Sequence, residues 1–365
     1  MKAAAKKKIK WGLPAALSIP LLLVGLFYLL RGDQPLMDRW VYGVMLPVEQ
    51  FWGRVWSIFP FSMMEVLVVL FLTGNVVWLV RAVVLAVRGS GWRALLRRTL
   101  ALAAAWLWLW CGLCWLWNPA YQASSFTQRS GLDVSPYSPV ELLLTTEYFA
   151  SRAAQLSTQV ERDEEGHYAK DWRESFETGP SVYENLTSEF PFLYMESVRA
   201  KPLMCSKLQS ILGFTGIYFP FTGEANVNVD APLCLVPATV AHEMSHQRMV
   251  ASELEANFVG IAACVSCDDV HFQYSGYLMG LIELCNALYP IAPDAWDAIV
   301  DYYFTPELSA DWNDNYHYWD ALESDVEEVA EQTYDAFLKS NDQPLGIRSY
   351  GACVDLLVAY FCPER

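Results

Sequence analysis

The chain has 365 residues, 54% of them hydrophobic, and its formal net charge is −16. This composition excludes an intrinsically disordered chain and a collagen-like repeat. The acidic total also argues against nucleic acid as a partner, because phosphate binding needs a concentrated basic surface. The length allows two ordinary domains, or one domain and a membrane part.

The charge is divided unevenly along the chain. Residues 1–118 contain thirteen Lys or Arg and four Asp or Glu, a net charge of +9. Residues 119–365 contain twelve Lys or Arg and thirty-seven Asp or Glu, a net charge of −25. A split of this kind indicates two environments, one apolar with basic flanks and one exposed to water.

Three long apolar runs in the first half predict transmembrane helices at residues 11–30, 66–87 and 100–117. Twenty helical residues at 1.5 Å each match a hydrocarbon core of about 30 Å. Residues 36–60 are rich in aromatic side chains but contain four charged ones, so this segment is expected to lie at the membrane surface. The lipid bilayer is therefore an expected partner.

The basic residues predict the orientation. Five lysines lie within the first ten residues, and the second cluster is Arg88, Arg93, Arg97 and Arg98. Three spans place both clusters on one side, which the positive-inside rule makes cytoplasmic, with the C-terminal domain outside. Because no small-x-small cleavage site follows the first run, we expect an uncleaved anchor rather than a signal peptide.

The second half predicts a mainly helical domain. We expect a linker at 119–137 and a soluble domain at 138–365, whose first helix begins with the capping box of Ser138, Pro139 and Glu141. The expected strands are 217–219 and 225–229, joined as a hairpin. Further helices are expected at 182–198 with a break at Pro191, 238–247, 253–267, 272–288, 294–304 with Asp294 as N-cap, 318–339 and 350–360.

The sequence H-E-M-S-H at residues 242–246 carries the clearest chemical signal. Residues four apart share a helix face, so His242 and His246 can bind one metal ion while Glu243 lies beside the water on that ion. Zn²⁺ often takes three protein ligands and lowers the pKa of a bound water to about 7. The motif predicts a zinc site with Glu243 as general base. The alternative is two histidines with ordinary helix contacts.

A third ligand is required, and Glu253 and Glu255 are the candidates. An unbroken helix would carry Glu253 about 10 Å beyond His246 along the axis, too far to share a metal. The chain must therefore turn between residues 247 and 252. The run E-L-E-A-N resembles a segment of several zincin families in which the first acid is the ligand. That resemblance favours Glu253, keeps Glu255 in reserve, and makes Asn257 a supporting partner of a ligand.

Several motifs together resemble a bacterial membrane-protein family called domain of unknown function 3810. They are F-P-F-T-G-E-A at 219–225, Asn228, H-E-M-S-H-Q-R at 242–248, E-x-E-A-N-F at 253–258 and S-Y-G at 349–351. The resemblance covers nearly the whole chain. It implies three spans in the bacterial cytoplasmic membrane, followed by a zincin-like zinc metallopeptidase domain.

The resemblance carries two further expectations. Met249 stands where a glycine is expected after H-Q-R, so a tight turn there would lose its most permissive residue; we expect the turn either to lie elsewhere or to be strained. The hairpin strand 225–229 is expected beside the active-site helix, where an edge strand can bind an extended peptide; a purely structural hairpin is the alternative.

Other polar groups give weaker signals. Tyr350, Arg348 and His317 are candidates for stabilising an oxyanion, with Tyr350 preferred as a second catalytic residue, although each is more often structural. Cys264 and Cys267 fit buried small side chains better than a metal site. The acids Glu323, Asp325, Glu327, Glu328 and Glu331 fit the solvated face of a helix.

These observations favour a membrane-anchored, zinc-dependent peptidase that hydrolyses peptide or protein substrates outside the cytoplasm. A non-catalytic sensor or scaffold is the main alternative, and it would close a structural zinc site with a fourth protein ligand. A protease that cuts within the membrane is less favoured, because the motif is far along the chain from any apolar run.

Overall fold

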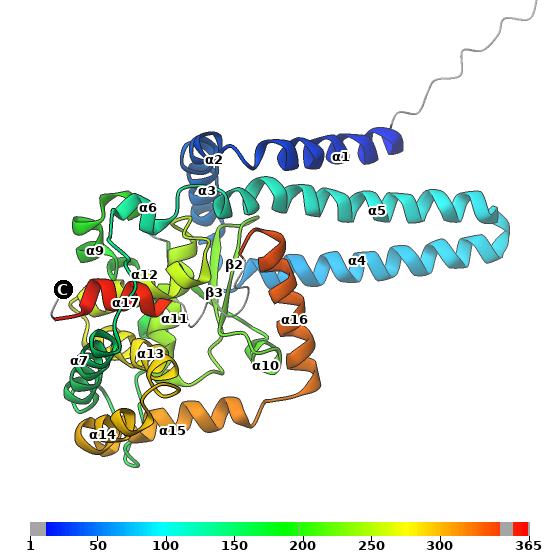
Figure 1. The fold of residues 1–365 in the computed structure, drawn as a ribbon. Helices are drawn as coiled ribbons and strands as arrows, with labels where there is room; N and C mark the ends of the chain where they lie inside the picture. The colour runs from blue at the N-terminus through cyan, green and yellow to red at the C-terminus, as the bar shows by residue number, and fades with distance from the viewer. Residues whose placement is uncertain (1–11, 197, 344–352, 364–365) are drawn as a thin grey trace, which may run out of the picture.

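The computed structural model describes residues 12–196, 198–343 and 353–363, and this part of the chain is mainly helical (Figure 1). Three helices are long and apolar enough to cross a membrane: α1 (Gly12–Leu30), α4 (Met63–Leu85) and α5 (Gly91–Leu116). They lie side by side and extend away from the rest of the protein. The predicted three membrane helices are thus confirmed in number and position.

The boundaries of the spans differ from the predicted ones at the turn between the second and the third. The second span continues beyond α4 into a π-helical turn (Ala86–Ser90), and α5 begins at Gly91 instead of residue 100. Arg93, Arg97 and Arg98 therefore belong to the first turns of α5. They remain at the end farthest from the soluble domain (Figure 1).

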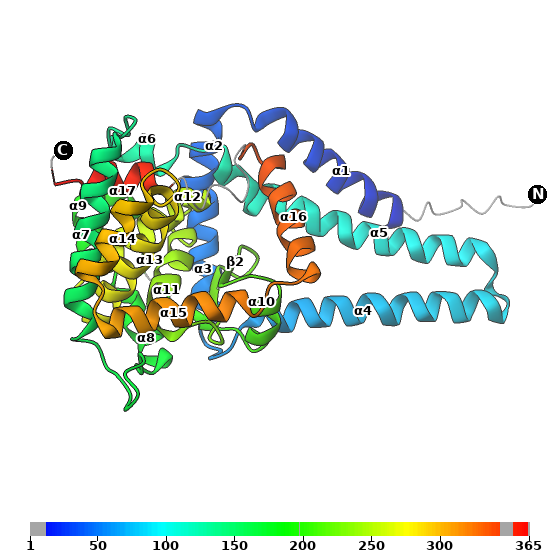
Figure 2. The same ribbon diagram turned by 60° about the horizontal axis from the view of Figure 1, so that its bottom comes forward.

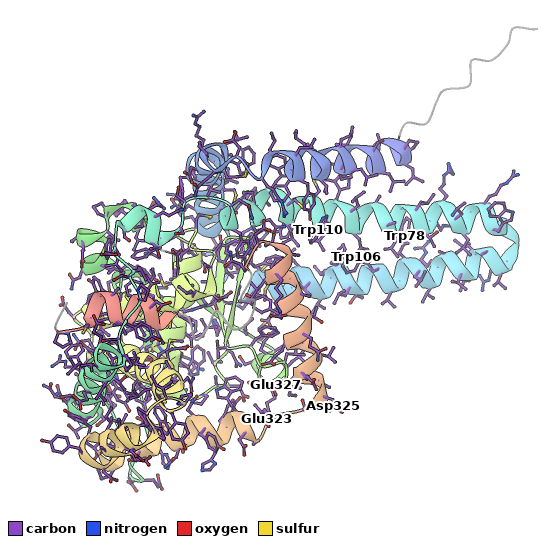
Figure 3. The ribbon with its side chains drawn as sticks, viewed as in Figure 1. Trp78, Trp106, Trp110, Glu323, Asp325 and Glu327 are labelled. Atoms are coloured by element: carbon purple, nitrogen blue, oxygen red, sulfur yellow. The ribbon has the colours of Figure 1, made fainter. Side chains whose placement is uncertain are left out.

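Two tryptophans join α4 and α5 between the helices (Figure 3). The indole N–H of Trp78 donates to the carbonyl of Arg98 at 3.0 Å, and that of Trp106 donates to the side chain of Asn75 at 2.9 Å. Such bonds satisfy polar groups that an apolar surrounding would leave unpaired. The two spans are therefore held in a fixed register.

The expected surface segment forms α2 (Gln34–Trp40), a π-helical turn (Val41–Met45) and α3 (Leu46–Trp56). It runs across the ends of the spans, between them and the soluble domain (Figures 1 and 2). Phe51 and Trp52 are exposed on it, as expected for aromatic residues at a bilayer surface. Its other face is buried against the soluble domain, which the sequence did not predict.

The remaining helices come after α5 in the chain. They are a 3₁₀ turn (Asn118–Tyr121), α6 (Phe126–Ser130), α7 (Pro139–Ser157), α8 (Trp172–Thr178), α9 (Glu184–Glu189), α10 (Ser206–Ile211), α11 (Val236–His246), α12 (Glu253–Ser266), α13 (Val270–Leu288), α14 (Pro293–Tyr303), α15 (Pro306–Asp320), α16 (Asp325–Ser340) and α17 (Val354–Phe361). Short 3₁₀ turns lie at Gly179–Ser181, Pro191–Leu193 and Leu233–Leu235. The predicted capping box at Ser138 is present at the start of α7.

Three predictions about these helices need correction. The expected helix 182–198 is reduced to α9 and a 3₁₀ turn, because Pro191 and its preceding residue cannot continue the hydrogen-bond ladder. Asp294 is the second residue of α14, and Ala292 occupies the N-cap position. The expected helix 318–339 is two helices, since Ser324 caps a new one by accepting from the Glu327 amide.

Residues 119–137, expected to be a linker, are part of the folded structure. The 3₁₀ turn and α6 lie here, and Ala120, Ala123 and Phe126 are buried. Burial of this kind fixes the exit of α5 against the domain. The polar composition of the segment does not reveal it, because a few apolar residues are enough to anchor a short connection.

A small sheet completes the fold, with strands β1 (Lys201–Pro202), β2 (Gly216–Phe219) and β3 (Glu224–Val227) in the order β1-β3-β2. β3 pairs with β1 in parallel and with β2 antiparallel. The predicted hairpin is present, but the expected role of 225–229 as an edge strand is wrong, because β3 is the central strand. β2 is the edge strand of the hairpin.

Two buried carboxylates tie the sheet to the start of α4. Glu224 accepts from the amides of Met63 and Met64 and pairs with Lys201, whose ammonium also donates to the carbonyl of Trp56 at 2.7 Å. Glu65 accepts from two amides near β1, those of Met204 and Cys205. These bonds use unpaired amides, including the helix N-terminus, and hold the soluble domain on the membrane part.

Candidate metal centre

Two helices bring three potential ligands together. α11 ends with His242 and His246 on one face, and α12 begins with Glu253. Glu253 Oε2 lies 3.2 Å from His242 Nε2 and 3.7 Å from His246 Nε2. One ligand atom from each of the three side chains lies within 4.8 Å of the others, and all three residues are buried.

The connection between the two helices is a tight turn at residues 247–252, where the sequence required one. The amide of Met249 bonds to the carbonyl of His246 at 3.0 Å, and that of Val250 bonds to the carbonyl of Ser245 at 3.3 Å. Met249 has φ = 63°, in the left-handed region that favours glycine. The strain expected from the replacement of glycine by methionine is therefore located at this residue.

The side chain of Met249 compensates for its backbone conformation. It is buried in an apolar cluster with Met37, Val41 and Met45 from the surface segment and Tyr218 from β2. Burial of a methionine side chain stabilises the fold by about 1.5–3 kcal/mol, which offsets the cost of about 1–2 kcal/mol for the left-handed conformation. The turn between α11 and α12 is thus held by contacts with the membrane part.

Gly260 allows α12 to approach α11 closely behind the ligands. A β-carbon at this position would lie 2.9 Å from the amide nitrogen and 3.0 Å from the Cα of His242. These are backbone atoms, which cannot move aside as a flexible side chain can. The residue therefore sets the spacing of the two helices and, with it, the approach of Glu253 to the histidines.

Hydrogen bonding leaves the ligand nitrogens available. His246 Nδ1 lies 2.7 Å from the carbonyl oxygen of Val250, so in the neutral ring Nδ1 carries the proton and Nε2 keeps its lone pair. His242 Nδ1 is buried without a partner among the described residues. The Trp117 ring packs edge-on against the imidazole of His246, with 5.6 Å between the ring centroids.

Charge interactions within the cluster follow from its burial. Burial disfavours the Glu253 carboxylate, but His246 and His242 outweigh this effect and hold its pKa below the ordinary value. Burial likewise opposes the charged form of His246, yet Glu253 raises the pKa of His246 to about 9. Glu253 is thus an anion placed between two imidazoles. A cation bound by all three groups would displace a proton from His246.

Glu243 lies on the same helix but on the side toward β2. A β-carbon on Gly216 would lie 2.4 Å from Glu243 Oε1, so the carboxyl group packs against the start of that strand. Its Oε2 is buried without a partner among the described residues. Burial raises the pKa of Glu243 to about 7, although both histidines oppose the shift. A carboxyl group in this state can exchange a proton near neutral pH.

The other predicted residues lie elsewhere. Glu255 accepts from the amides of Phe126 and Thr127, at 2.8 and 2.9 Å, so it anchors α6 instead of facing the histidines. Asn257 is buried one turn after Glu253, and its amide donates to Glu283 at 3.4 Å. His317 is exposed on α15. Tyr350 and Arg348 lie outside the described residues.

Tyr334 is a site residue that the sequence analysis missed. It lies on α16, and its hydroxyl donates a hydrogen bond to Glu253 Oε1. Its ring also packs edge-on against that of Phe214, which precedes β2. No local spacing relates Tyr334 to the H-E-M-S-H motif, because the contact joins residues eighty-one positions apart. Of the acids expected on a solvated face, Glu323 lies just before α16, and Asp325 and Glu327 lie in its first turn (Figure 3).

The cluster also lies close to the membrane part. Trp117, which contacts His246, directly follows the last residue of α5. The H-E-M-S-H motif is far from any apolar span along the chain, but in space it lies beside the end of α5, so the prediction that it is remote from the spans is wrong. All nine cysteines are free thiols, and Cys264 and Cys267 are buried, as expected for small side chains in the core.

The described residues therefore form an integral membrane protein with three spans and a helical domain seated on their ends. A family model described as a protein of unknown function (DUF3810) matches residues 41–358, and the chain belongs to that family. No curated protein and no solved structure matches the chain.

The donor set fits zinc. Two imidazole nitrogens and one carboxylate are the ligands of one common class of zinc site with an open position. The bond from His246 to a backbone carbonyl is the usual support of such a ligand, and the bond from Tyr334 does the same for Glu253. Three ligand atoms within 4.8 Å of one another can converge on one ion with little rearrangement.

Proposed function

We propose that the protein is a membrane-anchored, zinc-dependent peptidase. The observation that carries this proposal is the buried cluster of His242, His246 and Glu253 with the Glu243 carboxyl group beside it. Zinc bound there would polarise a peptide carbonyl and make a water molecule acidic enough to serve as nucleophile. Among the described residues the cluster offers three ligands, which supports an open site over a closed structural one.

Each residue then has a distinct part in the reaction. His242, His246 and Glu253 would hold the metal, and the Val250 carbonyl orients His246. Glu243, whose buried Oε2 has no partner among the described residues, would take a proton from the attacking water and deliver it to the leaving amine. Tyr334 orients Glu253 through its hydroxyl hydrogen bond. Burial of the cluster keeps competing water away from these groups.

The location of the proposed activity follows from charge. The basic residues of α5 lie at the end of the spans opposite the soluble domain (Figure 1). Under the positive-inside rule that end is cytoplasmic, so the domain and its metal centre face the outside of a bacterial cytoplasmic membrane. Peptide or protein substrates outside the cell, or in the periplasm, would be the ones within reach.

The proposal is tested by metal analysis and hydrolysis with the full chain in mild detergent. We expect about one zinc per chain, lost in His242→Ala and retained in His167→Ala, an exposed histidine that pairs with Asp314. Incubation with a randomised peptide library and mass spectrometry would detect cleavage. Wild-type protein without zinc, or with zinc but without cleavage of any peptide, would reject the peptidase.

A second comparison isolates the general base. Glu243→Gln should keep its zinc but lose at least a hundredfold in rate, because a positioned base contributes 10² or more. Glu164→Gln, an exposed loop residue, is the matched control and should retain full activity. If the Gln variant at 243 is as active as wild type, Glu243 does not have the assigned role. Zinc binding without hydrolysis in the wild type would favour the sensor or scaffold.

A further inference from the structure

We propose that the substrates of this site are themselves anchored in the membrane and are cut in the extended segment next to their transmembrane helix. This inference rests on the proposed peptidase function and names its substrate class. It is carried by the position of the edge strand β2, which runs from Glu243 to the third span. The following observations place its two ends.

The first end of β2 lies at the reacting groups. Gly216 begins the strand and packs against the Glu243 carboxyl group, and only a glycine leaves room for it. Tyr218, two residues on, contacts both Trp117 and His246 through its ring, with centroids 5.1 and 6.4 Å apart. A peptide paired with β2 would therefore have a backbone amide close to the cluster of His242, His246 and Glu253.

The second end of β2 lies against the membrane part. The turn after Phe219 carries Phe221, and a β-carbon on Gly112 of α5 would lie 2.4 Å from the ring of Phe221. Gly112 is about one helical turn before the end of α5, so the tip of the hairpin is seated beside the outer part of a span. Glu224, at the start of β3, caps the N-terminus of α4.

The outer edge of β2 carries backbone groups that point away from β3. Among the described residues β2 pairs with β3 alone, and the amide of Asn228 bonds to the carbonyl of Thr215 at 2.8 Å. Because hydrogen-bonded pairs alternate along an antiparallel ladder, Ile217 and Phe219 bond to β3 while Gly216 and Tyr218 direct their backbone groups outward. Ile217 is 40% exposed and offers an apolar contact beside that edge.

These positions define a path of fixed length. Four strand residues span about 13 Å, so a peptide paired with β2 connects the metal cluster with the membrane boundary in about four residues. A freely soluble chain gains nothing from this arrangement. A chain that leaves a bilayer helix enters the strand at Phe219 and reaches Glu243 within a few residues. The aromatic residues exposed on α3, including Phe51 and Trp52, fit a bilayer surface at the same level.

The test uses the full chain in liposomes and two peptide probes. One probe is a helix of about twenty leucines that continues into a twelve-residue randomised tail, and the other is the tail alone. For binding, Glu243→Gln protein carries the photo-crosslinker p-benzoylphenylalanine in place of Ile217. The control carries it in place of Val140, which is exposed on α7. Mass spectrometry maps the crosslinked tail positions.

We expect crosslinks from position 217 to the anchored probe, confined to roughly the first six tail residues, and few or none from position 140. Wild-type protein should cut the anchored probe at least tenfold faster than the free tail, within the same window. Crosslinks spread evenly along the tail, absent, or equal for the two positions would overturn the inference. So would equal cleavage of both probes, which would leave the peptidase itself intact.

The two proposals fail in different ways in this experiment. Crosslinks in the expected window without any cleavage would uphold membrane-anchored binding and reject the peptidase. Cleavage of the free tail at full rate, with no positional preference in the anchored probe, would uphold the peptidase and reject the substrate class. Phe221→Leu keeps an apolar side chain at Gly112 and should retain the positional window.

Discussion

Replacement of Met249 by glycine and by alanine tests how the turn between α11 and α12 is stabilised. A residue other than glycine in the left-handed conformation of Met249 destabilises the folded protein by about 1–2 kcal/mol. Glycine, in turn, loses more backbone entropy on folding than alanine, which costs about 0.5–1 kcal/mol. Both variants also lose a methionine side chain that is 3% exposed, which destabilises by about 2–5 kcal/mol. The wild type should therefore have the largest free energy of unfolding, and that of Met249→Gly should exceed that of Met249→Ala by about 0.5–1 kcal/mol.

The assay is urea-induced unfolding of the purified chain in mild detergent. Ala251 is the matched control, because it lies two residues on, is equally buried and does not have a positive φ. There, glycine should destabilise by about 0.5–1 kcal/mol relative to alanine. Two results would refute this explanation. One is that alanine is more stabilising than glycine at position 249, as it is at 251; the other is that either variant at 249 has a larger free energy of unfolding than the wild type.

Three further outcomes follow from the site and the core. Tyr334→Phe should weaken zinc binding about tenfold in chelator competition, since Glu253 loses a hydrogen bond; unchanged affinity would show that the bond does not orient the ligand. Gly260→Ala should lower the free energy of unfolding by about 1–3 kcal/mol in urea and should lower the zinc content, because the added methyl group meets the backbone of His242. A variant that is as stable and as rich in zinc as the wild type would contradict the close approach of α12 to α11. Burial raises the pKa of Glu283 to about 8, so the folded state holds a proton that the unfolded state loses above a pH of about 4.5. The free energy of unfolding should therefore fall as pH rises from 5 to 8, and Glu283→Gln should flatten this decline in urea unfolding measured at several pH values. An unaltered slope would show that the Glu283 carboxyl group ionises normally.

The sequence was sufficient where the determining interactions are local. An apolar run of about twenty residues is long enough to cross a bilayer as a helix, and three such helices are present among the described residues. The capping box at Ser138 depends on residues three positions apart, and the structure contains it. The split at Ser324 was also accessible, because Ser324 and Glu327 have capping-box spacing that the prediction of one long helix overlooked.

The candidate site likewise has some features that local sequence determines and others that depend on distant segments. The spacing of His242 and His246 places them on one helix face, and the distance to Glu253 required the turn that Met249 completes. The choice between Glu253 and Glu255 depended on the direction in which α12 starts, which no short-range pattern specifies. Glu255 instead bonds to amides of α6, more than a hundred residues earlier in the chain.

By itself, the sequence determined the three spans, the helical character of the domain and the motif of two histidines and a glutamate. Only the tertiary structure decided that β3 is central and β2 lies at the edge, and that Tyr334 reaches Glu253. It also decided that Trp117 brings the end of α5 against His246. The physical reason is range: helix periodicity and caps act within about four residues, whereas strand order and site composition depend on packing between distant segments.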